Sequence, residues 1–522
     1  MSSKDYFRPR GDITTVLDLT DRDSQDNTYF PLITEESFFH RGDHKTIYPS
    51  SLSIQEFTQR GPAEWGQKFS FEIGALPAGD LLQSVILQFK LGHWYNGNII
   101  SQLQQGLISA NIGPNSIPNQ YWTYMNSLGT AIIEYAEFIV NDQTIEKISG
   151  EFIKTFYNTF GDINNLIGIT TDAIGATPDS YLSTTPINPI STNSFVSQTA
   201  LNPNRPYPTE DGTFFCVLPF FFTRTRLNEV FPLLSCNENT VRIDIRLRPF
   251  DQVIRNYIGY RAFCSETPLS KKVSFNVTLS SETLLSDTVL CAPQFRDFRI
   301  LTVCPLITGS LREKFLHKPF EQMVKLVQTF HFDEPLKYLV SKPNMNSGQV
   351  EIQLPLELNH PTSELIWIFR RKAVLVNNEW ANFSPSISLE TNPNKVYPSW
   401  LDYASIRLNG SEVISANGEW FREHIAKVHK GGLITYDSYT YGYSFARYPD
   451  EHQPSGTVNM SRTSSVSLNL RVNQPITKDL SSLSPSCNFD PAVVGGWEVF
   501  VFAIHYNWLR FQNGICNRMF ID

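Results

Sequence analysis

The chain has 522 residues, of which 41% are hydrophobic and 13% aromatic, and its formal net charge is −8 at pH 7. This length predicts more than one domain, and the apolar fraction is sufficient for two large cores. The negative charge argues against a general electrostatic attraction to DNA, so we expect no direct nucleic-acid binding. The 37 Phe and 21 Tyr side chains favour strands over helices.

Cysteine spacing and the missing motifs exclude several kinds of site. The seven cysteines are scattered without a C-x-x-C pair, which argues against a disulfide framework or a zinc site and favours a reducing cytoplasm. No apolar run approaches the roughly 20 residues of a membrane helix, and the N-terminus lacks the apolar core of a secretory signal. We find no phosphate loop, nucleophile elbow or paired acid/base carboxylates, so we expect no enzyme, cofactor or metal.

The histidines offer the nearest approach to metal-ligand spacing. His40 and His44 are four residues apart but lie in a turn-like segment, and His424 and His429 are five residues apart. We interpret both pairs as solvated surface side chains, because ligand geometry at this spacing requires a helix. His360, which precedes a proline, is expected to be a hydrogen-bonded turn residue.

The first half of the sequence predicts an arm followed by strands. Residues 1–30 are polar and charged, which predicts an arm. Apolar residues then alternate with polar ones in several segments, and this pattern predicts half-buried antiparallel strands with one face in a core. The strands are expected at 52–57, with Leu52 and Ile54 facing the core, and at 69–73, 85–91, 134–140, 241–247 and 298–303. Residues 214–222 are apolar throughout and are expected to be buried on both sides.

Polar segments separate these strands. Residues 93–130 and 160–210 predict long surface excursions, and residues 309–320 predict a turn-like connection to a second half. In that half, strands are expected at 324–332, 352–358, 364–370, 403–408, 466–472 and 500–508, with Trp508 on the same apolar face as Phe500 and Phe502. The clearest helix is expected at 419–429.

The two halves repeat one pattern. Each runs strand, strand, long loop, and a strand that ends in an Asn turn; the offset between the Asn turns is 409 − 141 = 268, and between the second strands 352 − 69 = 283. We therefore predict an all-β double jelly roll: two antiparallel eight-stranded β-sandwiches in tandem, with long surface loops and few short helices. The predicted divisions are an arm at 1–30, a first jelly roll at 31–308 with excursions at 93–130 and 160–210, and a second jelly roll at 309–522.

Residues 443–462 (YSFARYPDEHQPSGTVNMSR) contain a proline-punctuated corner, in which Gly456 is expected to take a positive φ. Other short motifs stand in order along both halves. The residues that define all of these motifs are Trp65, Gly79, Asp80, Pro219, Phe221, Pro232, Asn359, His360, Pro361, Gln453, Pro454, Ser455, Gly456, Asn459, Ser461, Arg462, Tyr506, Asn507, Leu509 and Arg510. As an ordered set they resemble the major capsid proteins of nucleocytoplasmic large DNA viruses, of the iridovirus and phycodnavirus kind.

The resemblance implies a structural protein without catalytic activity. In that family, three double jelly rolls form a pseudo-hexagonal capsomer, and capsomers tile an icosahedral shell over an internal membrane. The implied partners are further copies of the chain in a homotrimer, neighbouring capsomers, minor capsid proteins and proteins of the internal viral membrane. The implied location is the virion shell, assembled in the host cytoplasm.

Two alternatives remain open at this stage. One is a minor or penton-type capsid protein, or a scaffold protein of the same fold, which copy number in the particle would distinguish. The other is a carbohydrate-binding or carbohydrate-active jelly-roll protein. An enzyme of that class should carry carboxylates roughly 5 to 10 Å apart beside a groove.

Overall fold

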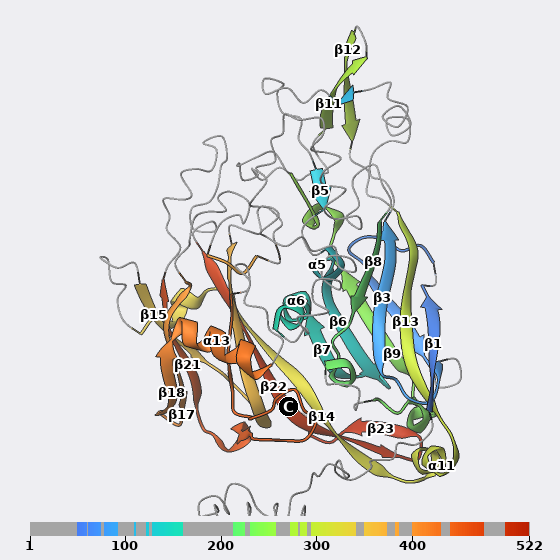
Figure 1. Ribbon diagram of the computed structural model, residues 1–522, viewed down its shortest axis with the longest axis vertical. Helices are drawn as coiled ribbons and strands as arrows, with labels where there is room; N and C mark the ends of the chain where they lie inside the picture. Colours follow the sequence, from blue (N-terminus) through green and yellow to red (C-terminus); the bar gives the residue numbers. More distant parts are fainter. Residues whose placement is uncertain are drawn as a thin grey trace, which may run out of the picture. The chain divides into compact units, whose positions relative to one another are not determined.

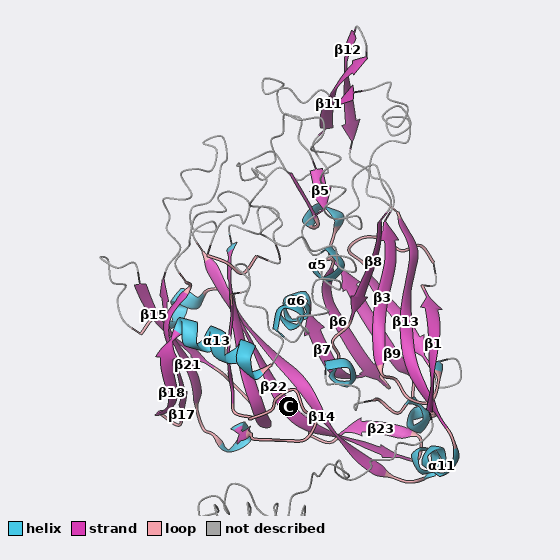
Figure 2. Ribbon diagram, viewed as in Figure 1, coloured by secondary structure: helices cyan, strands magenta, loops and turns pink. Residues whose placement is uncertain are grey.

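The computed structural model describes residues 50–59, 61–74, 78–91, 109–110, 122–124, 128–159, 212–224, 230–256, 272–279, 282–289, 294–340, 349–372, 380, 382–385, 399–429, 439–473 and 496–520. All of them belong to one of two compact units, 50–522; the other unit is 1–49. The predicted arm at 1–30 and the excursion at 160–210 lie outside the described residues. Strands dominate the described part, and the helices are few and short (Figure 2).

Eight strands of the first half form two antiparallel sheets, with strand orders β1-β13-β3-β8 and β2-β9-β6-β7. Their bounds are β1 Ser50–Thr58, β2 Lys68–Ile73, β3 Ser84–Leu91, β6 Ile133–Val140, β7 Gln143–Ser149, β8 Gly212–Val217, β9 Val241–Leu247 and β13 Phe295–Ile307. Three short helices accompany them: α5 Leu128–Ala131, α6 Gly150–Thr159 and α10 Phe221–Arg224.

The second set of eight strands forms sheets with orders β14-β22-β16-β19 and β15-β21-β17-β18. Their bounds are β14 Phe320–Phe332, β15 Gln349–Pro355, β16 Pro361–Arg371, β17 Leu401–Leu408, β18 Ser411–Asn417, β19 Thr440–Ser444, β21 Val466–Asn473 and β22 Trp497–Gln512. Helix α11 (Gly309–His317) lies between the two sets, and α13 (Gly418–Val428) follows β18. Short strands β20 (Val458–Asn459) and β23 (Ile515–Arg518) pair with β16 and β22. Strands β22 and β23 are labelled in Figure 1.

Strands outside the two sandwiches and four 3-10 helices complete the described part. They are β4 Ser109–Ala110, β5 Trp122–Tyr124, β10 Ile254–Asn256, β11 Lys272–Leu279 and β12 Glu282–Val289, which form two small sheets, and the 3-10 helices η2 Leu233–Cys236, η3 Phe250–Gln252, η5 Pro335–Tyr338 and η6 Met460–Arg462. None of the helices in the described ranges combines the length and the apolar character needed to cross a membrane.

Both sandwiches have the same topology. When the eight strands of each are counted in chain order, one sheet runs 1-8-3-6 and the other 2-7-4-5. All of the pairings are antiparallel, and apart from the hairpins β6–β7 and β17–β18 they join strands distant in sequence, which is the jelly-roll arrangement. The predicted fold class, an all-β double jelly roll, is therefore confirmed.

The offset of 268 residues extends well beyond the Asn turns. It relates β6 to β17, β7 to β18 and the start of α6 to the start of α13, and it also relates the irregularities in strand register at Phe138/Ile139 and Ile406/Arg407. Asn141 and Asn409 both have positive φ, 49° and 51°, as a tight hairpin turn requires. The two sandwiches are thus structural repeats at residue level in this region.

A glycine is required at the same place in both repeats. A Cβ on Gly150 would lie 2.2 Å from the carbonyl oxygen of Ile133, and one on Gly418 would lie 2.0 Å from that of Leu401. Any side chain would overlap the neighbouring backbone, so the helix can begin here only at glycine.

One sheet of the second sandwich is buried on both faces. Val499, Val501 and Ala503 of β22 belong to the core of the second sandwich, whereas Phe500 and Phe502 belong to the cluster centred on the first. This explains why residues 365–369 of β16 and 499–504 of β22 are apolar without alternation, because neither face meets water there. The two sandwiches therefore share an apolar contact.

Several sequence expectations are wrong in detail. Leu52 and Ile54 were expected in the core, but they are 67% and 64% exposed, because β1 lies at the edge of its sheet with these side chains turned outward. Trp508 is 39% exposed although Phe500 and Phe502 are buried, since the buried side chains at the end of β22 are those of Leu509 and Phe511, and Trp508 lies on the opposite, outer face.

Two segments also differ in structure from the prediction. The polar connection at 309–320 contains helix α11 instead of a turn. The segment at 214–222 is not one buried strand: β8 ends at Val217 before Pro219, α10 begins at Phe221, and Phe215 is exposed on the outer face. Proline ends the strand because it has no N–H to donate to the ladder.

Candidate functional site: the contact between the two sandwiches

The first ionic cluster in the contact centres on Glu146 of β7. Its carboxylate binds Nη2 of Arg224 at 2.7 Å and accepts backbone N–H groups from Phe221 at 2.8 Å and from Val327 of β14 at 3.2 Å. Arg224 also donates to the carbonyl of Lys325. A buried carboxylate is tolerable only when it is paired and hydrogen-bonded, and these partners come from both sandwiches.

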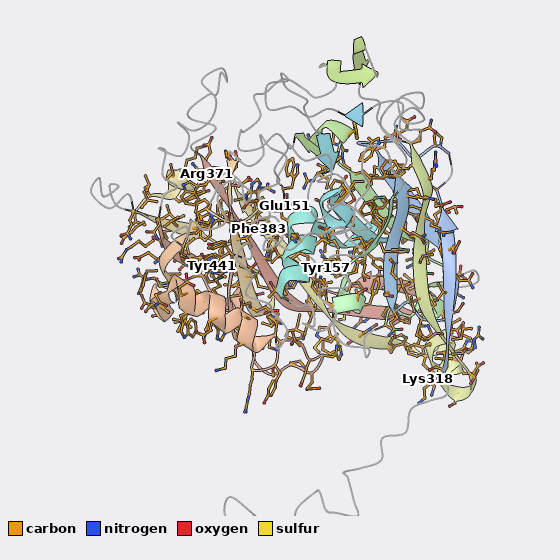
Figure 3. The ribbon with its side chains drawn as sticks, turned by 45° about the horizontal axis from the view of Figure 1, so that its top comes forward. Glu151, Tyr157, Lys318, Arg371, Phe383 and Tyr441 are labelled. Atoms are coloured by element: carbon orange, nitrogen blue, oxygen red, sulfur yellow. The ribbon has the colours of Figure 1, made fainter. Side chains whose placement is uncertain are left out.

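A second cluster links α6 to the second sandwich. Oε1 of Glu151 lies 3.1 Å from Nη2 of Arg248 and 2.8 Å from Nη1 of Arg370 in β16. Nε of Arg370 lies 2.6 Å from Glu498, whose other oxygen lies 2.7 Å from Nε2 of His331. The charges of Arg248, Glu151, Arg370 and Glu498 alternate in sign along this chain, which crosses from one sandwich to the other; Glu151 is labelled in Figure 3.

Electrostatics hold this cluster in its ionised form. Burial alone would raise the pKa of Glu151, but the guanidinium groups of Arg370 and Arg248 outweigh it and lower the pKa to about 2. Burial likewise opposes the charge of Arg370, yet Glu151 and Glu498 raise its pKa. The ring of Trp380 lies 3.8 Å from the guanidinium of Arg248, and this cation–π contact further stabilises the charged form of Arg248.

Apolar packing surrounds the charges. The ring of Phe152 in α6 lies 5.2 Å from that of Phe502 in β22, in an edge-to-face arrangement. Val324 and Leu326 of β14 and Ile366 of β16 are buried in the same cluster. A contact that is apolar and carries fully buried ion pairs is typical of a permanent interface.

Three side chains here could in principle hold a metal ion. Ligand atoms of His331, Asp333 and Glu498 lie within 4.8 Å of one another. However, Asp333 is bound to Lys372 at 2.9 Å and Glu498 to Arg370 at 2.6 Å. The two carboxylates already have cationic partners, so the arrangement is an ion-pair network.

The Asn-His-Pro turn and the Asn-x-Ser-Arg segment, 100 residues apart in sequence, meet in the structure. His360 has φ +70°; its N–H donates to Oγ of Ser461 at 2.9 Å and its carbonyl accepts from the N–H of Met460 at 3.1 Å. Oδ1 of Asn459 accepts from the N–H of Ser461 at 3.1 Å, and Asn459 pairs with Pro361 at the start of β16. Asn359 and Arg462 are exposed beside this junction.

Ser455 and Gly456 shape the corner that precedes this junction in the chain. Oγ of Ser455 accepts from the N–H of Tyr448 at 2.8 Å. Gly456 has φ +149°, and a Cβ there would lie 2.5 Å from the carbonyl oxygen of Phe445. Gln453 and Pro454 are exposed. The corner therefore needs glycine for both its conformation and its space.

A buried histidine holds the loop that leads into this corner. Nε2 of His429 lies 2.8 Å from Oε2 of Glu364, and its Nδ1 is bound to Oδ1 of Asp450. Burial alone would lower the pKa of His429, but the two carboxylates outweigh it and raise the pKa to about 9. Lys325 adds a bond from Nζ to the carbonyl of Pro449 at 2.7 Å. The interpretation of His429 as a solvated side chain is wrong, because this charged loop covers it.

The motif residues of the first half lie at several separate places. Oδ2 of Asp80 accepts from the N–H of Ile307 at 3.0 Å, which ties the start of β3 to the end of β13. Gly79 has φ +135°, and a Cβ there would lie 2.8 Å from Cβ of Cys304. Trp65 packs with its ring 4.5 Å from that of Phe295.

The motif residues Pro219, Phe221 and Pro232 and those of strand β22 support the contact between the two sandwiches. The carbonyl oxygen of Pro219 accepts a hydrogen bond from Nη1 of Arg224 at 3.1 Å, and the ring of Phe221 packs edge-to-face on that of Phe138. Pro232 is buried and directly precedes η2. In β22, Tyr506 and Leu509 are buried, Nδ2 of Asn507 donates to the carbonyl of Phe520 at 2.9 Å, and Arg510 binds Glu321 at 2.7 Å. The motif residues thus shape turns and strand ends, and those we describe do not converge on one pocket.

Sequence reasoning missed the charged residues of the contact itself. Lys325, Arg370 and Glu498 each interrupt or end a local run of apolar residues in their strand, and each is buried. That interruption is the signal that could have found them, because a charge inside an apolar run is retained only with a partner.

The topology defines the protein as a double jelly roll, and solved structures agree. The chain superposes on the PBCV-1 virus capsid model with a TM-score of 0.62 and 17% identity, covering 93% of this chain and 100% of that one. The Faustovirus major capsid protein gives a TM-score of 0.56 and 10% identity, with 94% of each chain covered. At these identities the likeness establishes the fold.

Sequence comparison establishes the family. Residues 37–278 match the family described as "Major capsid protein N-terminus", and residues 312–517 match "Large eukaryotic DNA virus major capsid protein". The major capsid protein of Pyramimonas orientalis virus is 25% identical over 233 residues, 40% of this chain and 48% of that protein. That of Paramecium bursaria Chlorella virus 1 is 25% identical over 232 residues, 39% of this chain and 49% of that protein.

The matched stretches span about half the length of these two curated relatives. Because the two family matches together cover most of both sandwiches, the chain belongs to the major capsid proteins of large eukaryotic DNA viruses.

Proposed function

We propose that this chain is the structural unit of a viral shell and that it acts by self-assembly, without catalysis. Three copies would form a capsomer, and capsomers would tile an icosahedral shell in the virion. The observation that carries the proposal is the repeat of one jelly-roll topology twice in a single chain. Three such chains around a threefold axis supply six similar sandwiches and a near-hexagonal outline.

The buried contact supports this function physically. A capsomer must keep its two sandwiches in a fixed relation while it packs against neighbours. Glu151 bridges the sandwiches through a buried ion pair with Arg370, Glu146 does so by accepting the N–H of Val327, and Phe152 packs on Phe502 beside them. Each chain would therefore enter assembly as one preformed building block.

We further propose the domain divisions 31–308 and 309–522. The connection between β13, which ends at Ile307, and β14, which begins at Phe320, passes through α11. Residues 1–30 would form an arm, and the motif residues that shape turns would serve folding and not chemistry.

The proposed partners are other copies of the chain, neighbouring capsomers, minor capsid proteins and proteins of the internal membrane. Assembly in the host cytoplasm is part of the proposal. The net charge of −8 favours protein partners over the genome.

Light scattering of the purified chain, with electron micrographs of the same peak, tests the proposal. We expect the mass of a trimer and particles with a hexagonal outline. A chain that remains monomeric at high concentration, and also when its viral chaperones and minor capsid proteins are co-expressed, would contradict it.

A further inference from the structure

The hairpin formed by β22 and β23 packs against the first sandwich. It turns at Asn513 and Gly514, whose φ values are 53° and 76°. The carbonyl of Gly514 accepts from the N–H of Glu238 at 3.2 Å, in the segment that follows η2. A Cβ on Gly514 would lie 2.2 Å from Oδ1 of Asn237, so only glycine allows this approach. The tip of the hairpin is therefore fitted closely to the first half of the chain.

One asparagine of the same segment binds the backbones of two cysteines. The N–H of Asn239 donates to the carbonyl of Cys236 at 3.1 Å, and its Nδ2 donates to the carbonyl of Cys516 at 3.4 Å. Cys236 is the last residue of η2, and Cys516 lies in β23. The two cysteines are 516 − 236 = 280 residues apart in the sequence, so their spacing indicates no pair. The fold brings them together through Asn239.

The two cysteines are buried in the same apolar cluster. Cys236 is 3% exposed and Cys516 is 1% exposed. In the β22–β23 ladder Cys516 is paired with Phe511. The ring of Phe511 lies 5.7 Å from that of Phe231 and 4.8 Å from that of Phe320. Burial raises the pKa of the Cys236 thiol, and the neighbouring thiol of Cys516 raises it further. The pair is therefore protonated and shielded while β23 stays in place.

The other two cysteines that the structure describes have different neighbours. Cys216 of β8 is buried beside the phenol of Tyr157, and Cys304 of β13 is buried beside the hydroxyl of Thr302. Each of these thiols interacts with a hydroxyl group and not with a second thiol. Cys216 and Cys304 are therefore matched controls of similar burial.

Access of a reagent to the cysteine pair depends on β23. This strand has four residues, Ile515–Arg518, and in the described part it pairs only with β22. Figure 1 labels β23 below the strands of the first sandwich. A short edge strand opens locally at a lower free energy than the core strands. In the open state both thiols meet water, and their pKa values return toward about 8.5, so that a thiolate can form.

We propose that Cys236 and Cys516 are a site of reversible oxidation, where a disulfide fastens β23 to the first sandwich. The oxidant is an external disulfide of the glutathione class. One cysteine thiolate attacks it, and a mixed disulfide forms as the first glutathione thiolate leaves. The second cysteine thiolate then attacks the mixed disulfide and releases the second glutathione. Two electrons pass to the oxidant, two protons leave the cysteines, and one S–S bond forms for the one that breaks.

This site goes beyond the proposed function and requires only the folded chain. A reducing cytoplasm would keep both thiols free during assembly, and the medium outside the cell would oxidise them. The disulfide would close a loop of about 280 residues and join the two halves covalently. Strand β23 could then no longer open away from η2, and the relation of the two sandwiches would be fixed after assembly.

Thiol mapping of the folded chain tests the site. In the test chain, Cys264, Cys291 and Cys487, which lie outside the described residues, are replaced by serine. The chain is equilibrated with oxidised glutathione, alkylated, and digested without reduction. We expect the loss of two of the four remaining thiols and one cross-linked peptide pair, which joins Cys236 to Cys516. Treatment with a reductant should restore both thiols.

Alanine variants of the test chain identify the partners. Cys236→Ala and Cys516→Ala should each yield no cross-linked peptide, and at most a mixed disulfide with glutathione. The matched control, Cys216→Ala with Cys304→Ala, should give the same cross-link as the test chain. The melting temperature of each reduced variant shows that it is folded.

Hydrogen exchange measures the effect of the disulfide on β23. Its amides should exchange on the order of 10-fold more slowly in the oxidised test chain than in the reduced one, because opening of the strand is prevented. In Cys516→Ala the same amides should exchange equally with and without oxidant. A cross-link without slower exchange would overturn the fastening of β23.

A second mapping removes any kinetic barrier to oxidation. The test chain is refolded from urea in a mixture of oxidised and reduced glutathione, so that the thiols are accessible before the fold closes. If Cys236 and Cys516 remain thiols in this refolded chain as well, or pair with Cys216 or Cys304, the site is overturned. A Cys236–Cys516 cross-link in both mappings supports it. These outcomes do not depend on the mass of the assembly, which tests the proposed function.

Discussion

Mild alkali should destabilise this protein through one buried histidine. The pKa of His429 is raised to about 9 in the folded chain from an ordinary value of 6.5, because Glu364 and Asp450 bind the protonated ring. A folded-state pKa above the unfolded value means that the stabilisation is complete below about pH 6.5 and is lost as the pH rises to about 9. At 1.36 kcal/mol per pKa unit, the loss is about 3 kcal/mol.

The measurement is the denaturant midpoint and slope between about pH 6 and about pH 9.5, at one protein concentration because assembly also affects stability. The control is the double variant Glu364→Gln with His429→Gln, which removes the charges on both buried partners together. We expect the free energy of unfolding to fall by about 3 kcal/mol more in the parent than in this variant. Parallel pH curves for the two proteins would refute the role of His429.

Two further predictions concern the ionic contact and the corner. Glu151→Gln should lower the free energy of unfolding, measured by urea titration, by about 3 to 5 kcal/mol, because it leaves Arg248 and Arg370 facing each other without their shared carboxylate. The control is Glu134→Gln, which breaks an exposed pair with Arg246 and should lower the free energy of unfolding by under about 1 kcal/mol. Gly456→Val should lower the melting temperature more than Gly410→Val, because both positions have positive φ but only Gly456 also faces a backbone oxygen at 2.5 Å. Equal losses within either pair of variants would contradict the reasoning.

The sequence alone determined the fold class and much of its internal symmetry. Alternation of apolar residues identifies half-buried strands whatever covers them, and Asn141 and Asn409 mark hairpin turns by their tolerance of positive φ. Because these signals are local, the offset of 268 residues is visible in the order of the amino acids. The offset of 283 between the second strands is also present in the fold, where Phe69 and Ile352 pair with Ile245 and Leu470 in corresponding strands.

Only the tertiary structure decided which face meets which partner. Alternation in β1 shows that its two faces differ, but it cannot tell that Leu52 and Ile54 point away from the core of their own sandwich. The unbroken apolar run at 499–504 in β22 indicates that both faces are buried there, but not that Phe502 packs against the helix that carries Glu151. The partners of Arg370 and His429 are likewise distant in sequence. Burial and ion pairing depend on contacts between segments tens to hundreds of residues apart, and no local pattern encodes them.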